Sequence, residues 1–528
     1  MTKRILSFLL ALAVLLPLCA CGRSAADDAA TDVPTMDPAQ IRYNDLRLPY
    51  ARADSLDPFK AKSTMNRQLT TLLYDSLFTV DNQFEEKPLI AKEYTTDNYS
   101  VLVTINSDVR FTDGSLLAVE DVLYSFDLAK ESAAYKSRLR NVVSADARSE
   151  NSILFALSSV DPYAVACLDF PIVKIGTSAE DRKAQRETTT GDDDDRPHKS
   201  TDQVLPVGSG RYVLSYEEGE PDPILTAYND RFKGFFPAMS VIHLVNVTDS
   251  SALFYSLEIG NISFAFDDLS SGKYTRVNAT ISEYPMNHFV FLGMNQDNAG
   301  LAQPAVRRAV CAAIDLQDVL NVAFQGHATV THTPFNPLWA AAAAYERAHA
   351  ADKQDARAIL QEAGFDQVNS YGILNNGRIS LSMNLLVSEG NDFKLMAAQQ
   401  IARKLELLKI KVKIITMPSE DFQKAVELGK FDLYIGEVNL SANMSLDAFF
   451  GGSGALAHGI WSKNAAEAYA DFLAGEINFD AFMEAFMLDM PFVPLCYRKG
   501  IVASVKELQG TQNACYADLY ADVEEWHF

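Results

Sequence analysis

The chain has 528 residues, of which 48% are hydrophobic and 22% are charged. This length is more than one hydrophobic core usually supports, so two or three domains are expected, and the composition is that of a soluble globular protein. The formal net charge of −23 argues against nucleic acid as a partner and against electrostatic attachment to an anionic membrane, because like charges repel.

The N-terminus has the pattern of an export signal. Lys3 and Arg4 precede an apolar run from Ile5 to Leu18, which is shorter than the roughly 20 residues that a membrane-spanning helix needs. Residues 1–20 are therefore predicted to be a signal peptide that is removed from the mature protein.

A lipid attachment site is predicted directly after this signal. The segment Leu18-Cys19-Ala20-Cys21-Gly22 resembles the bacterial lipobox, in which a small residue precedes a cysteine that is lipidated and becomes the first residue. An ordinary secretory cleavage site is the alternative. Residues 21–41 are rich in small and acidic side chains, as in a flexible tether. We expect an extracytoplasmic protein that is lipid-anchored to the outer face of the cell membrane, or in the periplasm if an outer membrane is present.

Beyond the tether, helical and strand-like periodicities alternate. Apolar residues at helical spacing predict helices over 65–77, 119–130, 249–259, 304–319, 350–365, 392–408 and 422–428. An alternating pattern over 99–111 predicts a strand followed by a hairpin turn at 106–108. Apolar runs predict further strands over 152–157, 170–175, 262–266, 289–294, 380–386, 411–415, 431–436 and 492–497. The run from Phe289 to Met294 is almost wholly apolar, as expected for a strand that is buried on both faces. The order of elements after residue 380 predicts an α/β lobe.

One long polar segment, residues 177–203, interrupts this pattern. It contains the acidic run Asp192-Asp193-Asp194-Asp195, for which calcium binding is one interpretation. The alternating acids, central glycine and distal glutamate of an EF-hand are missing, so a solvated surface loop is the preferred interpretation.

Reactive groups are sparse. Neither G-x-S-x-G nor H-E-x-x-H occurs, and His327 and His332 stand five residues apart instead of four, so an exported lipoprotein hydrolase is kept only as the alternative from another functional class. Cys496 and Cys515 could pair in an oxidising exterior, whereas Cys311, on an apolar helix, is predicted to be a buried thiol. We expect no metal site and no cofactor.

Several segments together resemble one protein family. Val109-Arg110-Phe111-Thr112-Asp113-Gly114, followed by Glu120-Asp121-Val122 and Tyr124-Ser125-Phe126, is similar to the signature V-x-F-x-D-G…E-D-V-x-Y-S of the large extracellular solute-binding proteins of bacterial ABC importers. This family includes dipeptide-, oligopeptide- and nickel-binding proteins. Further matches follow in the family's order at 56–58, 73–77, 207–212, 306–309, 313–315, 356–365 and 493–495. The resemblance covers essentially the whole mature chain.

The resemblance implies an α/β fold of the periplasmic-binding-protein-like type II, with two lobes, a hinge and an extra α/β subdomain (cluster C). The implied boundaries are 42–70, 204–284 and 490–528 for lobe I, 71–203 for the extra subdomain and 286–489 for lobe II. Residues 289–295 would lie just past the first hinge crossover, and residues 489–494 would lie at the return crossover. A ligand held between the lobes favours the closed state through contacts made only in that state.

The resemblance also implies the function and the partners. The protein is expected to be a monomeric substrate-binding lipoprotein that captures a peptide and delivers it to ABC permease subunits in the membrane. A nickel chelate, an oligosaccharide or a signalling peptide are alternative ligands. In peptide binders of the family, an aspartate often holds the ligand's terminal amine, but alignment on Phe449 puts Ala442 and Ser445 at the two aspartate positions of the matching segment. The amine anchor is therefore not carried over.

The candidate ligand-binding residues are polar and aromatic side chains whose expected positions lie in the cleft. They are Tyr212, Asn295, Phe335, Glu437, Asn439, Asn443, Asp447 and Trp461. For the polar residues the alternative is a loop whose side chains cap their own backbone, and for the aromatic residues it is ordinary core packing.

Overall fold

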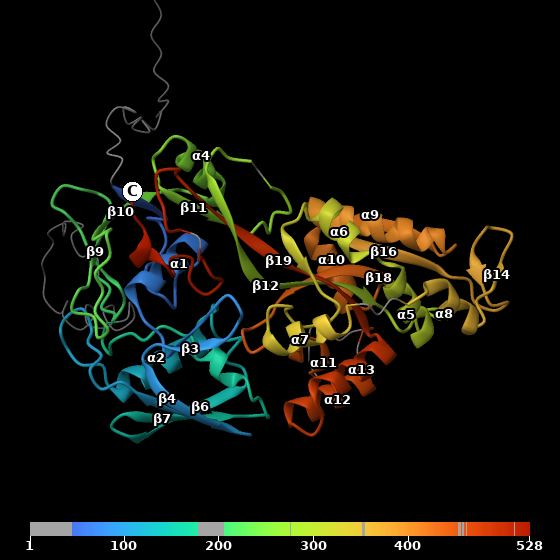
Figure 1. The fold of residues 1–528 in the computed structure, drawn as a ribbon, viewed down its shortest axis with the longest axis horizontal. Helices are drawn as coiled ribbons and strands as arrows, with labels where there is room; N and C mark the ends of the chain where they lie inside the picture. Colours follow the sequence, from blue (N-terminus) through green and yellow to red (C-terminus); the bar gives the residue numbers. More distant parts are fainter. Residues whose placement is uncertain are drawn as a thin grey trace, which may run out of the picture. The chain divides into compact units, whose positions relative to one another are not determined.

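The computed structural model describes residues 45–177, 205–274, 276–350, 354–451, 456, 459–460, 462–511 and 513–528 (Figure 1). The predicted signal peptide, tether and Cys21, nearly all of the acidic segment 177–203, and Trp461 lie outside these residues. Among the described helices, none is long and apolar enough to cross a membrane.

The first core surrounds a four-stranded sheet with the order β1-β10-β9-β8. Its strands are β1 (Leu46–Tyr50), β8 (Tyr212–Ser215), β9 (Ile224–Ala227) and β10 (Val241–Asn246). The helices α1 (Thr64–Leu73) and α4 (Leu253–Glu258) and the short helices η3 (Ser250–Ala252) and η4 (Val523–Glu525) belong to this region. The fully buried Trp526 brings the C-terminal segment into the same core.

The second core surrounds an antiparallel sheet with the order β4-β5-β7-β6. Its elements are β2 (Phe78–Val80), β3 (Glu86–Pro88), β4 (Ala91–Asp97), β5 (Ser100–Ile105), α2 (Val119–Glu131), β6 (Val142–Ser149), β7 (Ser152–Leu157) and η2 (Ala164–Cys167). Strand β5 buries Val101, Val103 and Ile105 and leaves the residues between them half-buried, because successive side chains of a strand point to opposite faces.

The predicted strand over 170–175 is wrong. Only an isolated bridge joins Pro171 to Ser76, because proline has no N–H to donate to a ladder. The apolar side chains of Phe170 and Ile172 instead fill the second core from an irregular segment. This segment is held by the family signature, since the carboxylate of Asp121 accepts hydrogen bonds from Ala118 N at 2.9 Å and from Ile175 N at 3.0 Å.

The third core surrounds most of a seven-stranded sheet with the order β11-β19-β12-β18-β16-β17, to which β13 adds by pairing with β19. Its strands are β11 (Phe264–Asp267), β12 (Thr280–Met294), β13 (Ala328–Val330), β16 (Ser382–Ser388), β17 (Lys411–Met417), β18 (Leu433–Asn439) and β19 (Phe492–Ser504). Its helices are α5 (Pro304–Ala313), α6 (Leu316–Ala323), α7 (Ala340–Ala348), α8 (Ala356–Glu362), α9 (Asp392–Leu407), α10 (Ser419–Glu427), α11 (Asp447–Phe450), α12 (Lys463–Leu473) and α13 (Phe479–Asp489). A small hairpin of β14 (Gln367–Val368) and β15 (Leu374–Asn375) completes this region.

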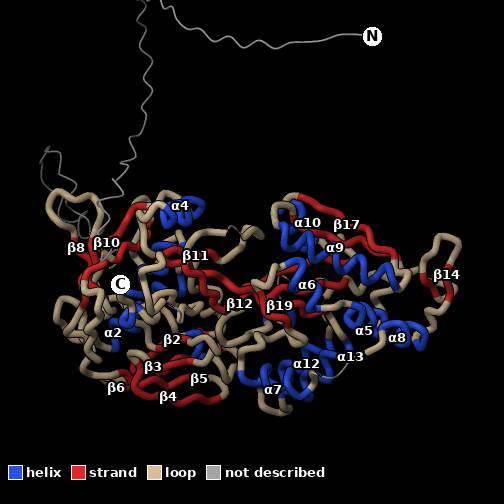
Figure 2. The backbone as a smooth tube through the Cα atoms, turned by 45° about the horizontal axis from the view of Figure 1, so that its top comes forward, coloured by secondary structure: helices blue, strands red, loops and turns tan. Residues whose placement is uncertain are grey.

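Two long antiparallel strands, β12 and β19, connect the first core with the third (Figures 1 and 2). Tyr284 and Val502 at one end pack in the first core, whereas Phe291 and Phe492 at the other end pack in the third. The register shifts between Pro285 and Phe289 and again beyond Val290. The apolar strand predicted over 289–294 is thus the second half of a strand of 15 residues.

The helix predicted over 304–319 is two helices. Helix α5 ends at Ala313 and α6 begins at Leu316. Asp315 between them has an extended backbone, and its side chain accepts a hydrogen bond from Asp318 N. An aspartate that caps the next helix cannot also continue the preceding one, because an N-cap residue has a non-helical backbone.

The cysteines also differ from expectation. Cys496 and Cys515 are both buried free thiols, so the suggested disulfide is wrong. Cys496 lies in the third core on β19, whereas Cys515 packs near the carbonyl oxygen of Val80. Cys311 is half-buried rather than buried, although burial of its thiol still raises its pKa to about 12.

Candidate functional site

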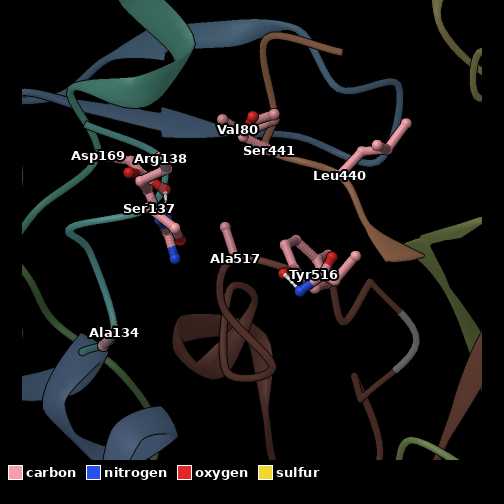
Figure 3. A pocket seen from close by; sticks show the side chains of 11 residues that line it. Val80, Ala134, Ser137, Arg138, Asp169, Leu440, Ser441, Tyr516 and Ala517 are labelled. Atoms are coloured by element: carbon pink, nitrogen blue, oxygen red, sulfur yellow. Dashed lines mark hydrogen bonds and ion pairs between the residues drawn. The ribbon is translucent and has the colours of Figure 1, made fainter. Parts of the chain in front are cut away.

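Two cavities, of ≈ 90 and ≈ 220 Å³, lie where the loop that follows β18 faces the second core. Both are lined by Ser137, Arg138, Asn439, Leu440 and Ser441, so they adjoin. Figure 3 shows the smaller one, which is closed on a further side by Tyr516 and Ala517 of the C-terminal segment. The site is therefore assembled from three parts of the chain that are far apart in sequence.

The loop 440–448 is shaped by buried amides beneath it. Asn287 on β12 is fully buried, and its Nδ2 donates hydrogen bonds to the carbonyl oxygens of Leu440 at 3.0 Å and Ser441 at 2.9 Å. Asn336 Nδ2 donates in turn to Asn287 Oδ1 at 3.2 Å. Buried polar groups that satisfy one another hold a loop in one conformation. The cavity wall is therefore fixed by the strand that runs between the cores.

Two hydrogen bonds cross from this loop to the opposite walls. Asn443 Nδ2 donates to Asp161 Oδ2 of the second-core region at 2.7 Å. Asn439 Nδ2 donates to Tyr516 Oη of the C-terminal segment at 2.7 Å. Asn443 is also held within its own loop, because its Oδ1 accepts a hydrogen bond from Ser441 Oγ at 2.5 Å. The first two of these contacts join the opposite walls of the cavities directly.

Charged side chains of both signs line the cavities. Arg138 forms an ion pair with Asp169, and its guanidinium lies 4.9 Å from the centre of the Tyr135 ring. Arg140, Asp161 and Asp447 line the larger cavity. Burial raises the pKa of Asp161, and the nearby charge of Asp447 adds to this effect. Burial also raises the pKa of Asp169, while the Arg138 guanidinium partly offsets the rise.

Three of the predicted residues meet at this site. Asn439 lines both cavities, and Asn443 and Asp447 line the larger one. Ala442 lines the smaller cavity and Ser445 lines the larger one. The two positions that align with the family's aspartates are therefore part of the cavity lining. Neither side chain can carry the negative charge that an aspartate would supply there.

Glu437 lies directly before the first residue of the cavity wall, Val438, among two cationic side chains and a histidine. Its carboxylate lies 2.6 Å from Arg498 Nε, 2.7 Å from Lys394 Nζ and 3.2 Å from His288 Nδ1. Burial acts to raise the pKa of Glu437, but the His288 hydrogen bond and the charges of Arg498 and Lys394 outweigh it and hold the pKa well below its ordinary value. This carboxylate joins β18 to β19, β12 and α9.

The remaining described candidates lie inside the cores. Tyr212 is fully buried in the first core, where its hydroxyl donates to the carbonyl oxygen of Met239 at 2.8 Å. Asn295 is 5% exposed and its Nδ2 donates to Phe431 O at 2.8 Å. Phe335 is 1% exposed, among aromatic rings of the third core. None of the three lines either cavity.

Sequence reasoning missed the residues that the second-core region contributes. Arg138, Asp161 and Asp169 lie in irregular segments around β6 and β7, where neither periodicity nor a motif marks them. Tyr516 lies in an irregular segment after β19. A sequence signal for these residues would require knowing which loops meet.

The described residues include no group of three or more histidine, cysteine, aspartate or glutamate side chains arranged to hold a metal ion. The polar groups that line the cavities are amides, hydroxyls, carboxylates and guanidinium groups. This set can form directional hydrogen bonds and ion pairs with a small polar solute.

The family profile described as bacterial extracellular solute-binding proteins, family 5 Middle, matches residues 85–456. The match covers more than half of the chain, including most of the second core from β3 onwards, the strands β12 and β18, and the loop at the cavities. The chain therefore belongs to the bacterial extracellular solute-binding proteins of family 5, as the signature at 109–126 predicted.

Among curated proteins, the chain is 22% identical over 506 residues to the oligopeptide-binding protein AppA of Bacillus subtilis, covering 87% of this chain and 86% of AppA. The solved structure of that AppA, in complex with a nonapeptide, is similar with a TM-score of 0.55 and 20% identity over 92% of this chain and 98% of AppA. The periplasmic murein tripeptide-binding protein MppA, in an unliganded open form, has a TM-score of 0.69 at 15% identity over 92% and 97%. NikZ from Campylobacter jejuni, in complex with Ni(L-His), has a TM-score of 0.59 at 18% identity over 92% and 99%. These structures confirm the expected fold class.

Proposed function

We propose that this protein is the substrate-binding component of an ABC importer, which captures an extracellular peptide and delivers it to permease subunits in the membrane. The observation that carries the proposal is the site itself. Polar and charged walls from three distant parts of the chain meet around one pair of cavities, and two hydrogen bonds cross between those walls. A ligand that bridges the walls would stabilise the closed arrangement.

The lobes of this proposal follow the expected boundaries. Lobe I comprises 42–70, 204–284 and 490–528, the extra subdomain 71–203, and lobe II 286–489. The paired strands β12 and β19 are the hinge in this proposal, and the register shift after Pro285 supports it. A pleated ladder is weakest where its hydrogen bonds are interrupted, so bending concentrates there.

A short peptide is the ligand class that we favour. AppA is named for oligopeptides, and peptides offer both ionic ends and backbone donors and acceptors to a lining of this kind. The cavities fall below the roughly 300–1,000 Å³ of typical small-molecule sites. A ligand of a few residues therefore suits the closed arrangement better than a long one.

The membrane attachment and the absence of catalysis are also proposals. We infer that the chain is exported and lipidated at Cys21, which is supported by the lipobox-like segment 18–22. Metabolic labelling with a fatty acid would tag the wild-type protein but not Cys21→Ser. We also infer binding without turnover. Hydrolysis of chromogenic ester, peptide or glycoside substrates by the purified protein would instead support the hydrolase alternative.

Native mass spectrometry of the protein with Cys21 replaced by serine, purified from its exported fraction, tests the ligand class. A ladder of masses that matches short peptides is the expected result. A nickel complex or an oligosaccharide would overturn the peptide assignment while leaving the solute-binding role. The absence of any bound solute, together with no stabilisation by peptide mixtures, would contradict the proposal.

A further inference from the structure

A short segment beside the paired strands β12 and β19 links the first core to the third. It consists of residues 268–272, here called the strap, and it follows β11 directly. Strand β11 packs Phe264 and Phe266 in the first core, whereas Leu269, just past the end of the strand, packs in the third core. The strap therefore passes from one core to the other within a few residues.

The strap is held by side chains of β19 and α9. Arg498 Nη1 donates a hydrogen bond to the carbonyl oxygen of Asp268 at 2.9 Å, and Asn391 Nδ2 donates one to the carbonyl oxygen of Ser270 at 3.2 Å. Asn391 is the N-cap of α9, so the second contact joins the strap to the start of that helix. In Figures 1 and 2, β11 lies on the first-core side of the paired strands and α9 on the third-core side.

The conformation of the strap is fixed around Leu269. Its backbone is left-handed, with a φ of 53°, and its side chain is buried. A leucine is unfavourable in this conformation and keeps it only where the surrounding structure holds it there. The carboxylates of Asp267 and Asp268 accept hydrogen bonds from the amide groups of Leu269 and Ser270, both at 2.8 Å. These turns direct the leucine side chain into the third core.

The contacts of the strap span the point where the ladder between β12 and β19 is interrupted. Strand β11 pairs with Ile501–Ser504 of β19, on the first-core side of this point. The interruption follows the pair formed by Pro285 and Lys499, and Arg498 is the next residue of β19 towards the third core. Bending there moves α9 relative to β11. Because one residue spans at most about 3.6 Å, a strap this short must then stretch or release its contacts.

We propose that the strap is a third connection between the lobes, which stabilises their closed arrangement from the hinge side. This inference rests on the proposed function, in which the lobes close about β12 and β19. The structure contains the strap contacts together with the two hydrogen bonds that cross between the cavity walls, so the two sets are compatible. The strap lines neither cavity. Its release should therefore lower the affinity for every ligand by the same factor, through a smaller closed population.

The first test places a wedge between the strap and α9. Gly272 has a φ of +68°, and a Cβ at this position would lie 2.4 Å from Asn391 Oδ1, so Gly272→Ala forces the strap away from the helix. Gly372→Ala is the matched control. Gly372 has a similar φ of +77°, but a Cβ there would meet nothing within 4 Å among the described residues. The control therefore carries the same backbone strain without the wedge.

The second test removes one hydrogen bond and keeps the helix cap. Asn391 Oδ1 accepts a hydrogen bond from Lys394 N, while Nδ2 donates to Ser270 O. Asn391→Asp keeps the acceptor and the shape of the side chain but loses the donor. Asn478→Asp is the matched control, because Asn478 caps α13 through the same kind of contact, from Ala481 N.

The measurements use the exported protein with Cys21→Ser. Small-angle X-ray scattering gives the radius of gyration of the ligand-free protein. Titration calorimetry gives the affinity and the binding stoichiometry for an equimolar mixture of di- to pentapeptides. A variant that is merely less stable binds with a lower stoichiometry, whereas a shift from closed to open protein lowers the affinity itself.

Both strap variants are expected to have a larger radius of gyration than wild type and an affinity that is lower by about threefold or more. Both controls should stay within about twofold of the wild-type affinity. Strap variants that match their controls in both measurements would overturn the inference and leave the proposed function intact. A strap variant that is more compact and binds more tightly would also overturn it, because the strap would then hold the lobes apart. If wild type binds no peptide, the peptide assignment fails, and the radius of gyration alone decides whether the strap holds the lobes together.

Discussion

Strand β18 and the loop that follows it are consecutive in sequence, but the side chains of the strand mainly stabilise the fold, whereas those of the loop line the cavities. Up to Glu437, the strand Leu433–Asn439 satisfies its side chains within the third-core region. The Glu437 carboxylate contacts Arg498, Lys394 and His288, and Gly436 lies against the Phe291 ring. The loop 440–448 directs Asn443 across the cavities to Asp161 and exposes Asp447 to the larger one. A polar side chain whose partners all lie in the same core region stabilises the fold. One whose partners lie across a cavity is available to a ligand.

The largest loss of stability is expected from a substitution in the strand. Glu437→Gln would leave the 3% exposed Arg498 side chain, together with Lys394, without its counter-charge. Removing one partner of a buried ion pair typically costs about 3–5 kcal/mol. Denaturant unfolding should show this loss. Glu283→Gln is the control, because its partners are partly exposed and the change should stay within about 1 kcal/mol.

The same carboxylate gives a pH dependence of known sign. Its folded pKa lies below the ordinary value of 4.5, so the unfolded chain binds a proton at a higher pH than the folded protein does. The stabilisation is full above pH 4.5 and decreases as the pH falls towards the folded pKa. The free energy of unfolding, followed from about pH 6 to pH 3, should therefore fall more steeply in wild type than in Glu437→Gln. Equal slopes would contradict this role.

A smaller loss of stability is expected from a substitution at Gly436, the residue before Glu437. A Cβ at Gly436 would lie 2.2 Å from Phe291 Cζ, so Gly436→Ala forces the ring to move. Overpacking of this kind costs about 1–3 kcal/mol. The double variant with Phe291→Leu provides the control. It should be less destabilised than the sum of the two single changes, because the smaller side chain makes room, and strict additivity would argue against the contact.

The loop should respond differently, with binding affected as well as stability. Asn443→Ala removes the donor to Asp161 Oδ2, which costs about 1–3 kcal/mol when the acceptor stays buried. Affinity for the peptide mixture, measured by calorimetry, should also fall, because the contact between the walls is lost. Ser445→Ala is the control, because Ser445 lines the same cavity but makes no contact with the opposite wall. The affinity of this variant for the peptide mixture should stay within about threefold of wild type. Asn443→Ala and Glu437→Gln should be compared at the same fraction of folded protein. If Glu437→Gln then weakened peptide binding more than Asn443→Ala does, the claim that the loop binds the ligand while the strand stabilises the fold would be wrong.

The smallest effect on the free energy of unfolding is expected at the hydrogen bond between Asn439 and Tyr516. Tyr516→Phe removes the hydroxyl that accepts from Asn439 Nδ2. Asn439 is exposed, so water replaces the lost partner and the free energy of unfolding should change by less than about 0.5 kcal/mol. Thermal unfolding and peptide titration would both test this. A loss of binding as large as that of Asn443→Ala would mean that the C-terminal segment shares the closing contact equally.

The sequence by itself determined the parts of this protein that depend on neighbouring residues. Strand β7 over Ser152–Leu157 was predicted with its observed bounds, and α2 and α9 to within one residue at their C-terminal ends. Periodicity and capping are local properties, so a short window of sequence contains them. The signature at 109–126 identified the family for the same reason, since its residues form one turn and the start of one helix.

Tertiary structure alone decided what the site contains. Asn443 and Asp161 are 282 residues apart, and no pattern in either segment specifies the other. Asn295 and Phe335 suit a binding site by residue type, yet long-range packing places them in a core. Arg138 and Asp169 have ordinary sequence surroundings, yet the fold places them at a cavity. Residue type and spacing state what a side chain can do, but burial and the partners brought by distant segments decide whether it serves the core or a ligand.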